Sequence, residues 1–336
     1  MTGAQAQLFD AVGTPGDGSS PVAAANAATL APLAASLGPR VHLGTSSWHF
    51  PGWAGLVWDR EYPEAMLSRH GLAAYSQHPL MRCVSVDRSF YRPVDAATFA
   101  RMAAQVPEDF RFVVKAPSTI TDAQLRDPES GRGLQANPSF LDPRLALESF
   151  IAPAVAGLGS KIGALVFQLS PLGHGHLRDR AALLAALDTL FAVCAPALPA
   201  PGVLALEVRD GALLTPDLAA LLKHHGVRYC LGLHERMPPI EHQLPMLRAL
   251  WPGPLVCRWN LQRGLRYTQA KDLFAPFDRL QAPDPATRAA LARVIAGTVA
   301  TGYAAYATIN NKAEGSAPLS VVELAKAIAK ERRATT

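Results

Sequence analysis

The chain has 336 residues, of which 49% are hydrophobic and 18% are charged, and its net charge at pH 7 is +5. This composition provides enough apolar surface for a buried core and excludes a chain that is disordered throughout. The net charge alone does not indicate a nucleic-acid partner, and no apolar run approaches the roughly 20 residues of a membrane-spanning helix.

The amino-terminal part differs in composition from the rest of the chain. Residues 1–38 are rich in Ala, Gly, Pro and Ser and nearly uncharged, which predicts a flexible extension before a folded domain at 39–333. Residues 1–12 lack the basic start and apolar core of a secretory signal. The four cysteines show no paired spacing. We therefore expect a cytoplasmic protein without a disulfide framework and without a membrane partner.

Eight short runs of β-forming residues follow, with helical patterns between them. The runs are 41–47, 83–89, 110–115, 162–168, 203–209, 228–234, 255–258 and 303–310. The expected helices are 72–78, 95–106 (capped by Asp95), 143–157, 178–193, 215–225 (capped by Thr215), 284–301 and 320–333, with excursions at 117–142 and 234–252. Alternating strands and helices predict crossover connections and parallel pairing. Eight such units predict a single (β/α)8 TIM-type barrel with outer helices.

Charged and polar side chains gather at the carboxyl ends of these runs. Glu207 and Arg209 are two residues apart and should share one face of their strand. The outer face of a barrel strand packs against helices, where an unpaired charge costs several kcal/mol. These charges are therefore expected inside the barrel or at its mouth, where barrel enzymes place their active sites.

Several separated motifs resemble the YecE-like family, also known as domain of unknown function 72. The motifs run in order over about residues 41–328: Gly44–Trp48 leading to Trp53, Val84–Tyr91, Phe110–Pro117 with Ile120-Thr121, Phe167–Leu169, Leu206–Arg209, Arg258, and Ile309–Asn311 with Ala317. The resemblance implies a (β/α)8-type barrel of unknown biochemical role. Two positions depart from the family pattern. Ser85 stands where a Glu is usual, and Trp259-Asn260 replaces a usual His-Gly.

Three strand ends carry the candidate catalytic chemistry. Glu207 could act as a base while Arg209 holds an anionic group, or the two could form a structural ion pair. Lys115 could contact an anion, pair with Asp87 or Glu207, or act as a Schiff-base nucleophile, the role we place last. Arg258 has the same anion-binding interpretation, with structural pairing as the alternative.

Polar residues at neighbouring ends are candidates for substrate recognition. The residues two apart at the end of the second run should share a face of their strand: Asp87, Ser89 and Tyr91. Asp87 is a further catalytic candidate. Tyr91 could bind substrate through its hydroxyl or could only pack against its neighbours. Gln168 and the pair Asn310-Asn311 carry amides suited to hydroxyl or carbonyl groups, or to the loop backbone.

The aromatic residues, the possible metal ligands and the cofactor motifs give weaker evidence about function. The loop from Trp48 to Trp58 could stack on a ligand, but we favour a hydrophobic lid in which Trp48 touches ligand. His234 could bind substrate or, with Glu207 and Asp87, a metal. Since it is the one His at a strand end, we expect no metal. No phosphate loop or dinucleotide fingerprint occurs, so no cofactor is expected, and residues 312–316 read as an ordinary surface turn.

These residues together predict an enzyme that performs acid/base chemistry on a small anionic, hydroxylated molecule such as a sugar phosphate. Glu207 would be the acid/base, and Arg209, Lys115 and Arg258 would bind the anion. The rival hypothesis is a non-catalytic protein that binds a ligand or nucleic acid.

Overall fold

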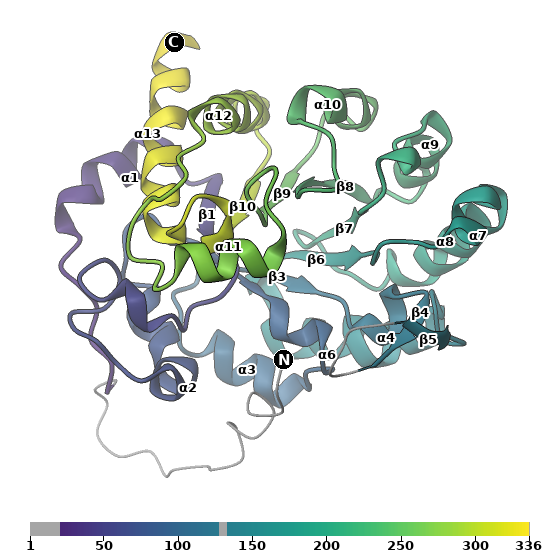
Figure 1. The fold of residues 1–336 in the computed structure, drawn as a ribbon, viewed down its shortest axis with the longest axis horizontal. Coiled ribbons are helices and arrows are strands. Elements are labelled where there is room, and N and C mark those ends of the chain that lie inside the picture. Colours follow the sequence, from purple (N-terminus) through teal and green to yellow (C-terminus); the bar gives the residue numbers. More distant parts are fainter. Residues whose placement is uncertain (1–20, 128–132, 336) are drawn as a thin grey trace.

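Eight parallel strands close into a barrel in the computed structural model, which describes residues 21–127 and 133–335. The strands are β1 (Val41–Thr45), β2 (Cys83–Val86), β3 (Arg111–Lys115), β6 (Ile162–Gln168), β7 (Val203–Glu207), β8 (Arg228–Leu233), β9 (Leu255–Trp259) and β10 (Ala305–Ile309). Each pairs with its sequence neighbours in the barrel, and β10 closes onto β1 (Figure 1). The predicted TIM-type barrel and all eight predicted strands are confirmed.

Side-chain alternation divides the barrel core into an inner and an outer part. A small apolar cluster inside the barrel contains Val113, Val166, Ala205 and Val256 from four different strands. Every second residue of a strand shares a face, so the inward rows continue to the carboxyl ends. There the rows end in polar or small residues: Lys115, Gln168, Glu207, Gly232, Arg258 and Thr308. A much larger apolar cluster packs the outer faces of the strands against the helices.

Helices surround the strands, most of them in an outer layer (Figure 1). They are α1 (Ala31–Leu37), α2 (Glu64–Tyr75), α3 (Ala96–Ala103), α4 (Ser118–Thr121), α5 (Pro143–Ala146), α6 (Ala152–Leu158), α7 (His174–Arg178), α8 (Arg180–Cys194), α9 (Pro216–His224), α10 (Ile240–Ala249), α11 (Tyr267–Phe274), α12 (Pro285–Ala300) and α13 (Ala317–Thr335). The expected caps form, since Asp95 and Thr215 accept from the backbone N–H groups of Thr98 and Leu218. Helix α2 begins eight residues before the predicted start. Its N-cap residue is Pro63, which makes no side-chain capping hydrogen bond, so the usual sequence signal of a helix start is missing there.

The flexible extension predicted for residues 1–38 needs correction in its described part. Residues 1–20 lie outside the described residues, whereas residues 21–38 include helix α1. Val22 and Leu37 are buried, and the backbone N–H of Ala25 donates to the carbonyl of Val57. Two well-placed apolar residues and a few backbone hydrogen bonds anchor this segment, which average composition does not reveal.

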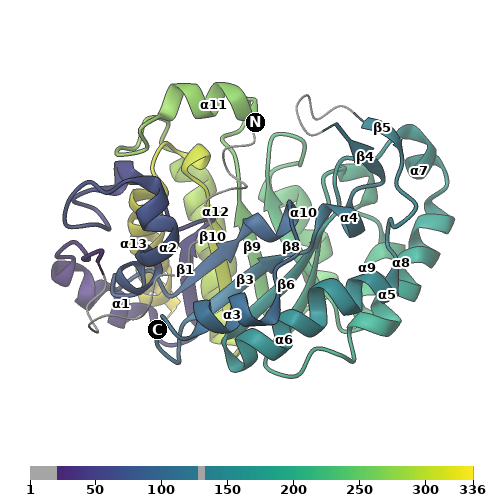
Figure 2. The same cartoon turned by 90° about the horizontal axis from the view of Figure 1, so that it is seen from below.

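The excursions between strands rise at the carboxyl end of the barrel. Figure 2 shows α11 and the β4–β5 hairpin on opposite sides of this end. The hairpin joins β4 (Gln124–Arg126) to β5 (Gly133–Ala136) and belongs to the excursion after β3. Among the described residues, no helix is both long enough and apolar enough to cross a membrane.

Candidate functional site

Charged side chains from four barrel strands and the turns after them meet inside the carboxyl end of the barrel. Lys115 ends β3, Glu207 ends β7 and Arg258 lies on β9, while Asp87 directly follows β2 and Arg209 lies two residues beyond β7. Hydrogen bonds, ion pairs and electrostatic interactions connect all five groups. We call these five residues the mouth cluster. The structure thus brings Lys115, Glu207, Arg209 and Arg258 together at this end of the barrel.

Arg258 bridges the two carboxylates of the mouth cluster. Its Nη1 lies 2.6 Å from Oε2 of Glu207, and its Nη2 lies 2.7 and 2.8 Å from the two carboxylate oxygens of Asp87. Only 1% of Arg258 is exposed. A buried guanidinium requires such partners, and the two carboxylates raise the pKa of Arg258 against the opposing effect of burial, which keeps it charged.

One terminal nitrogen of the Arg209 guanidinium is hydrogen-bonded, and the other is not. Its Nη2 lies 2.8 Å from Oε1 of Glu207 and 2.8 Å from Oε1 of Gln168. The same Gln168 oxygen accepts from Nη1 of Arg258 at 3.2 Å, so one amide joins both guanidiniums. Nη1 of Arg209 is buried without a hydrogen-bond partner among the described residues. It is therefore a donor that a ligand oxygen could satisfy.

Glu207 does not have the properties of the predicted acid/base. Its two oxygens face Arg209 and Arg258, and Asn260 donates to Oε1 at 3.2 Å. Burial alone would raise the pKa of this carboxyl, but the two guanidiniums outweigh burial and hold the pKa below its ordinary value. A permanently ionised carboxylate with both oxygens occupied is poorly suited to exchange protons near neutral pH. We therefore reassign Glu207 to fixing the two arginines.

Lys115 is buried without the carboxylate partner considered in the sequence analysis. It is 9% exposed, and within the described ranges its ammonium forms neither an ion pair nor a hydrogen bond. Nζ instead lies 3.5 Å from the centroid of the Phe90 ring. Burial, reinforced by the charges of Arg258 and Arg209, lowers the pKa of Lys115 to about 7, even though Asp87 and Glu207 act in the opposite direction. The amine therefore exchanges protons near neutral pH.

The turn after β2 corrects the predicted alignment of Asp87, Ser89 and Tyr91. The strand ends at Val86, and Asp87–Phe90 form one turn of 3₁₀ helix, so side chains two apart no longer share a face. Ser89 is buried and its hydroxyl bonds to strand carbonyls, whereas Tyr91 is 70% exposed. Asp87 stays in the mouth cluster, with its side chain 29% exposed. Ser85, the departure from the family pattern, donates to Asp87 at 2.6 Å.

The amide oxygens after β10 bond to local structure, which was the alternative considered for these residues, while Nδ2 of Asn311 is buried without a partner among the described residues. Oδ1 of Asn310 accepts from the backbone N–H and from Nζ of Lys312, and Nδ2 donates to Ser46. Oδ1 of Asn311 accepts from the Trp53 indole at 3.1 Å and from the backbone N–H of Ala317 at 2.8 Å. Asn311 thus ties the aromatic loop to the start of α13.

The segment 312–316 is not the surface turn that its composition suggested. Lys312 is 4% exposed, and Glu314 and Ser316 are fully buried. The carbonyl of Glu314 accepts from the backbone N–H groups of residues 281 and 282, so the chain after α11 covers this loop. Nζ of Lys312 lies 4.3 Å from the Tyr267 ring centroid. Burial first, and then Lys271, lower the pKa of Lys312 to about 8.

The aromatic loop is a buried rim element. Trp53 and Trp58 are completely buried and Trp48 is 4% exposed, so these rings form no open stacking platform. This agrees with the hydrophobic lid favoured from the sequence. Nε1 of Trp48 is buried without a partner among the described residues, and Arg88 lies over the ring, 5.5 Å from its centroid. A ligand contact by Trp48 stays a prediction.

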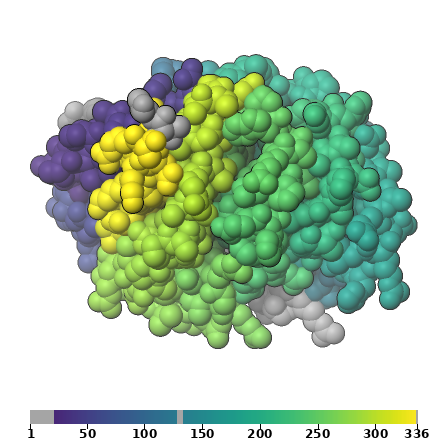
Figure 3. Space-filling model, turned by 90° about the horizontal axis from the view of Figure 1, so that it is seen from above, coloured from purple at the N-terminus to yellow at the C-terminus, as the bar shows by residue number. Residues whose placement is uncertain are grey.

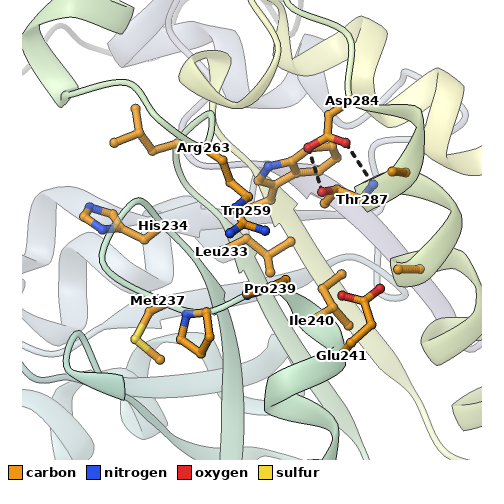
Figure 4. A pocket seen from close by; sticks show the side chains of 14 residues that line it. Leu233, His234, Met237, Pro239, Ile240, Glu241, Trp259, Arg263, Asp284 and Thr287 are labelled. Atoms are coloured by element: carbon orange, nitrogen blue, oxygen red, sulfur yellow. Dashed lines mark hydrogen bonds between the residues drawn. The ribbon is translucent and has the colours of Figure 1, made fainter. Parts of the chain in front are cut away.

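His234 lies at the edge of a separate cavity of about 260 Å³. The cavity lies outside the β8–β9 wall, between the first turns of α10 and α12, which are neighbours in Figures 1 and 3. In Figure 4 the His234 ring points away from Leu233, Trp259 and the other lining residues. Burial and the nearby Arg209 lower the pKa of His234 to about 4. His234, Glu207 and Asp87 are not among any group of described residues that could hold a metal ion.

Sequence reasoning missed three residues of this region. Phe90 supports the Lys115 amine, Asn260 donates to Glu207, and Lys312 lies buried beside the mouth. Asn260 could have been found, since it lies two residues after Arg258 and continues its inward row.

Comparisons with known proteins agree with this fold. A family model described as protein of unknown function DUF72 matches residues 42–336. A DUF72 family protein from Enterococcus faecalis V583 is 15% identical, with a TM-score of 0.55 over 86% of this chain and 95% of that chain. A DUF72 family protein from Thermotoga maritima MSB8 is 17% identical, with a TM-score of 0.53 over 85% of this chain and 98% of that chain. No curated protein matches the chain.

Proposed function

Because this chain belongs to the DUF72 family, which is described as a family of unknown function, we propose its function from the mouth cluster. We propose an enzyme that transfers protons to and from a small anionic, hydroxylated molecule such as a sugar phosphate. Lys115 exchanges the proton, Arg209 binds the anionic group, and Glu207 with Gln168 fixes the arginines.

The observation that carries this proposal is the unpaired amine of Lys115 within a cluster that is otherwise balanced. The carboxylates of Asp87 and Glu207 offset the guanidiniums of Arg209 and Arg258. A protonated Lys115 is then an uncompensated buried charge, which burial disfavours. Such an amine is costly for folding, and perturbed groups of this kind concentrate at functional sites. A pKa of about 7 also suits a general acid/base near neutral pH.

The free donor of Arg209 supports an anionic ligand. Nη1 of Arg209 is buried without a hydrogen-bond acceptor among the described residues, and Nζ of Lys115, on a residue that is 9% exposed, forms no hydrogen bond or ion pair there. An oxygen of a carboxylate or phosphate would satisfy the guanidinium donor and compensate the ammonium charge at once. The ordered guanidinium of Arg209, fixed by Glu207 and Gln168, needs little rearrangement to stabilise negative charge that develops during reaction.

Exposed polar side chains beside the mouth cluster support recognition of ligand hydroxyl groups. Asp87 keeps part of its carboxylate exposed, where it can accept from ligand hydroxyls. Tyr91 and Tyr267 expose 70% and 47% of their surface and interact electrostatically with Asp87 and with each other. Exposed tyrosines beside a carboxylate offer both a flat apolar face and polar tips to a sugar-like molecule.

The test combines ligand binding with proton exchange. A thermal-shift screen of phosphorylated and carboxylated sugars on the full chain should give hits that stabilise the wild type and that are weakened by Arg209→Gln. Lys326→Met, an exposed lysine change on α13, is the control and should keep every hit. NMR of a hit in D2O should then show exchange of a carbon-bound proton in the wild type and none in Lys115→Met. Hits that bind without any exchange would instead support the non-catalytic alternative.

A further inference from the structure

We infer that Lys115 is also a nucleophile, whose amine forms an imine with the carbonyl carbon of a small molecule that carries an anionic group. This inference rests on the proposed function and narrows its substrate class to 2-oxo acids and phosphorylated ketones or aldehydes. From the sequence this role ranked last, behind contact with an anion and pairing with Asp87 or Glu207. In the structure neither carboxylate pairs with Lys115, since Arg258 bridges both of them.

Comparison with the other buried lysines shows what distinguishes Lys115. Lys161 is also buried, but its ammonium donates to the carbonyls of Ala103 and Val106 at 2.9 and 2.8 Å and approaches Glu108 at 3.2 Å. Lys312 donates to Oδ1 of Asn310 at 3.1 Å. For Lys115 the structure gives only the contact with the Phe90 ring among the described residues. Its nitrogen lone pair is therefore available for bond formation once the proton leaves.

Two nearby guanidiniums favour that loss of the proton. Arg258 and Arg209 act on Lys115 with the same sign as burial, and neighbouring cations are a known means of activating an amine nucleophile. With a pKa of about 7, about half of the Lys115 amines are neutral at pH 7, against roughly 0.03% for an ordinary lysine.

The reaction step balances without any further reagent. The neutral nitrogen of Lys115 attacks the carbonyl carbon, a carbon–nitrogen bond forms as the carbon–oxygen π bond breaks, and one of the two amine protons passes to the oxygen, which becomes a hydroxyl. The second amine proton passes through solvent water to the departing hydroxyl, because both oxygens of Asp87 already accept from Arg258. One water leaves, and amine plus carbonyl have become imine plus water.

Charge explains why the carbonyl compound should carry an anionic group. A protonated imine would be one more buried cation beside Arg209 and Arg258, as unfavourable as the ammonium it replaces. A carboxylate or phosphate on the same molecule compensates that charge and binds Nη1 of Arg209. Neutral aldehydes and ketones lack this compensation, so they should react with Lys115 much more slowly.

The experiment is reductive trapping on the folded full chain. Glyoxylate, pyruvate and dihydroxyacetone phosphate are each incubated with cyanoborohydride at pH 7, and peptide masses identify the modified lysines. We expect Lys115 to be modified at least about tenfold faster than Lys161, Lys312 or Lys326, with a rate that rises through a midpoint near pH 7. Acetone, the neutral control, should label Lys115 poorly.

Three variants make the outcome decisive. Lys115→Met and Lys115→Arg should abolish the fast adduct, whereas Lys326→Met should leave it unchanged. Thermal unfolding confirms that each variant is folded. An unmodified Lys115 in the folded wild type, with adducts spread over exposed lysines, would overturn the inference. If trapping fails while sugar phosphates still bind and exchange protons, only imine formation is refuted. If binding and exchange fail as well, the proposed function fails with it.

Discussion

Arg258 and Glu207 contact each other across an intervening strand. Arg258 is on β9 and Glu207 on β7, yet Nη1 and Oε2 are 2.6 Å apart because Gly232 on β8 has no side chain between them. A Cβ atom at position 232 would lie 3.3 Å from Oε1 of Glu207. The glycine thus allows two charges on non-neighbouring strands to form the centre of the mouth cluster.

We predict that Gly232→Ala destabilises the protein by about 1–2 kcal/mol, because the methyl group would push the Glu207 carboxylate by a few tenths of an ångström within its fixed guanidinium contacts. Denaturant unfolding measures this change. Gly297→Ala is the matched control, since a Cβ added at that position would meet nothing within 4 Å beyond the backbone of its own helix α12, and alanine favours helix by up to about 1 kcal/mol. Equal effects of the two substitutions would contradict the tight approach at Gly232.

Glu207→Gln should cost about 3–5 kcal/mol of stability at pH 7, because it leaves two buried guanidiniums without a shared counter-charge. Since the folded-state pKa of Glu207 is lowered, its contribution is present above the ordinary carboxyl pKa and is lost as pH falls through the folded-state value. The difference between wild type and variant should therefore shrink in acid. Glu148→Gln, at an exposed pair with Arg144, should change stability by less than about 1 kcal/mol.

Lys115→Met should stabilise the protein at pH 6, because it removes a buried ammonium that has no partner among the described residues. The unfolded chain holds this proton up to the ordinary lysine pKa, whereas the folded chain releases it near pH 7. Wild-type stability therefore rises with pH between these two values, and the advantage of the variant should decline by up to about 1.4 kcal/mol per pH unit. Thermal melts from pH 6 to 10 test this. A constant difference would indicate an ordinary lysine pKa.

Asn311→Ala should destabilise the protein by roughly 2 kcal/mol, since the Trp53 indole and the Ala317 amide lose a buried acceptor. Because this residue ties the loop to α13 and makes no contact with the mouth cluster, reductive labelling of Lys115 should persist in the folded variant. Loss of labelling in a variant that is still folded would assign Asn311 to the site.

The sequence predicted the barrel because strand order and side-chain period are local properties. The polar strand ends Lys115, Gln168, Glu207 and Arg258 follow from the same period, and the structure brings them together. The prediction from side-chain alternation was wrong after Val86, because the chain leaves the strand there in a 3₁₀ turn. Tyr91 consequently lies at the surface. No local pattern signals where a strand gives way to such a turn.

Partner choice was the other part that local patterns could not predict. Pairing with a carboxylate was one of the alternatives considered for Lys115, but Arg258 occupies both Asp87 and Glu207. Likewise, the polar segment from Lys312 to Ser316 is buried because the chain after α11 folds over it. Such competition among distant segments depends on the closed barrel, so a sequence predicts the members of the site better than their pairing and their charge.

The most direct test of the account is the titration of Lys115 itself. NMR of its side-chain nitrogen, assigned by comparison with Lys115→Met, measures the pKa in the intact protein. We predict a midpoint of about 7, with Lys326 titrating near the ordinary lysine value. A midpoint for Lys115 close to that of Lys326 would show that the amine is charged at neutral pH and would contradict both its proton exchange and its nucleophilic role.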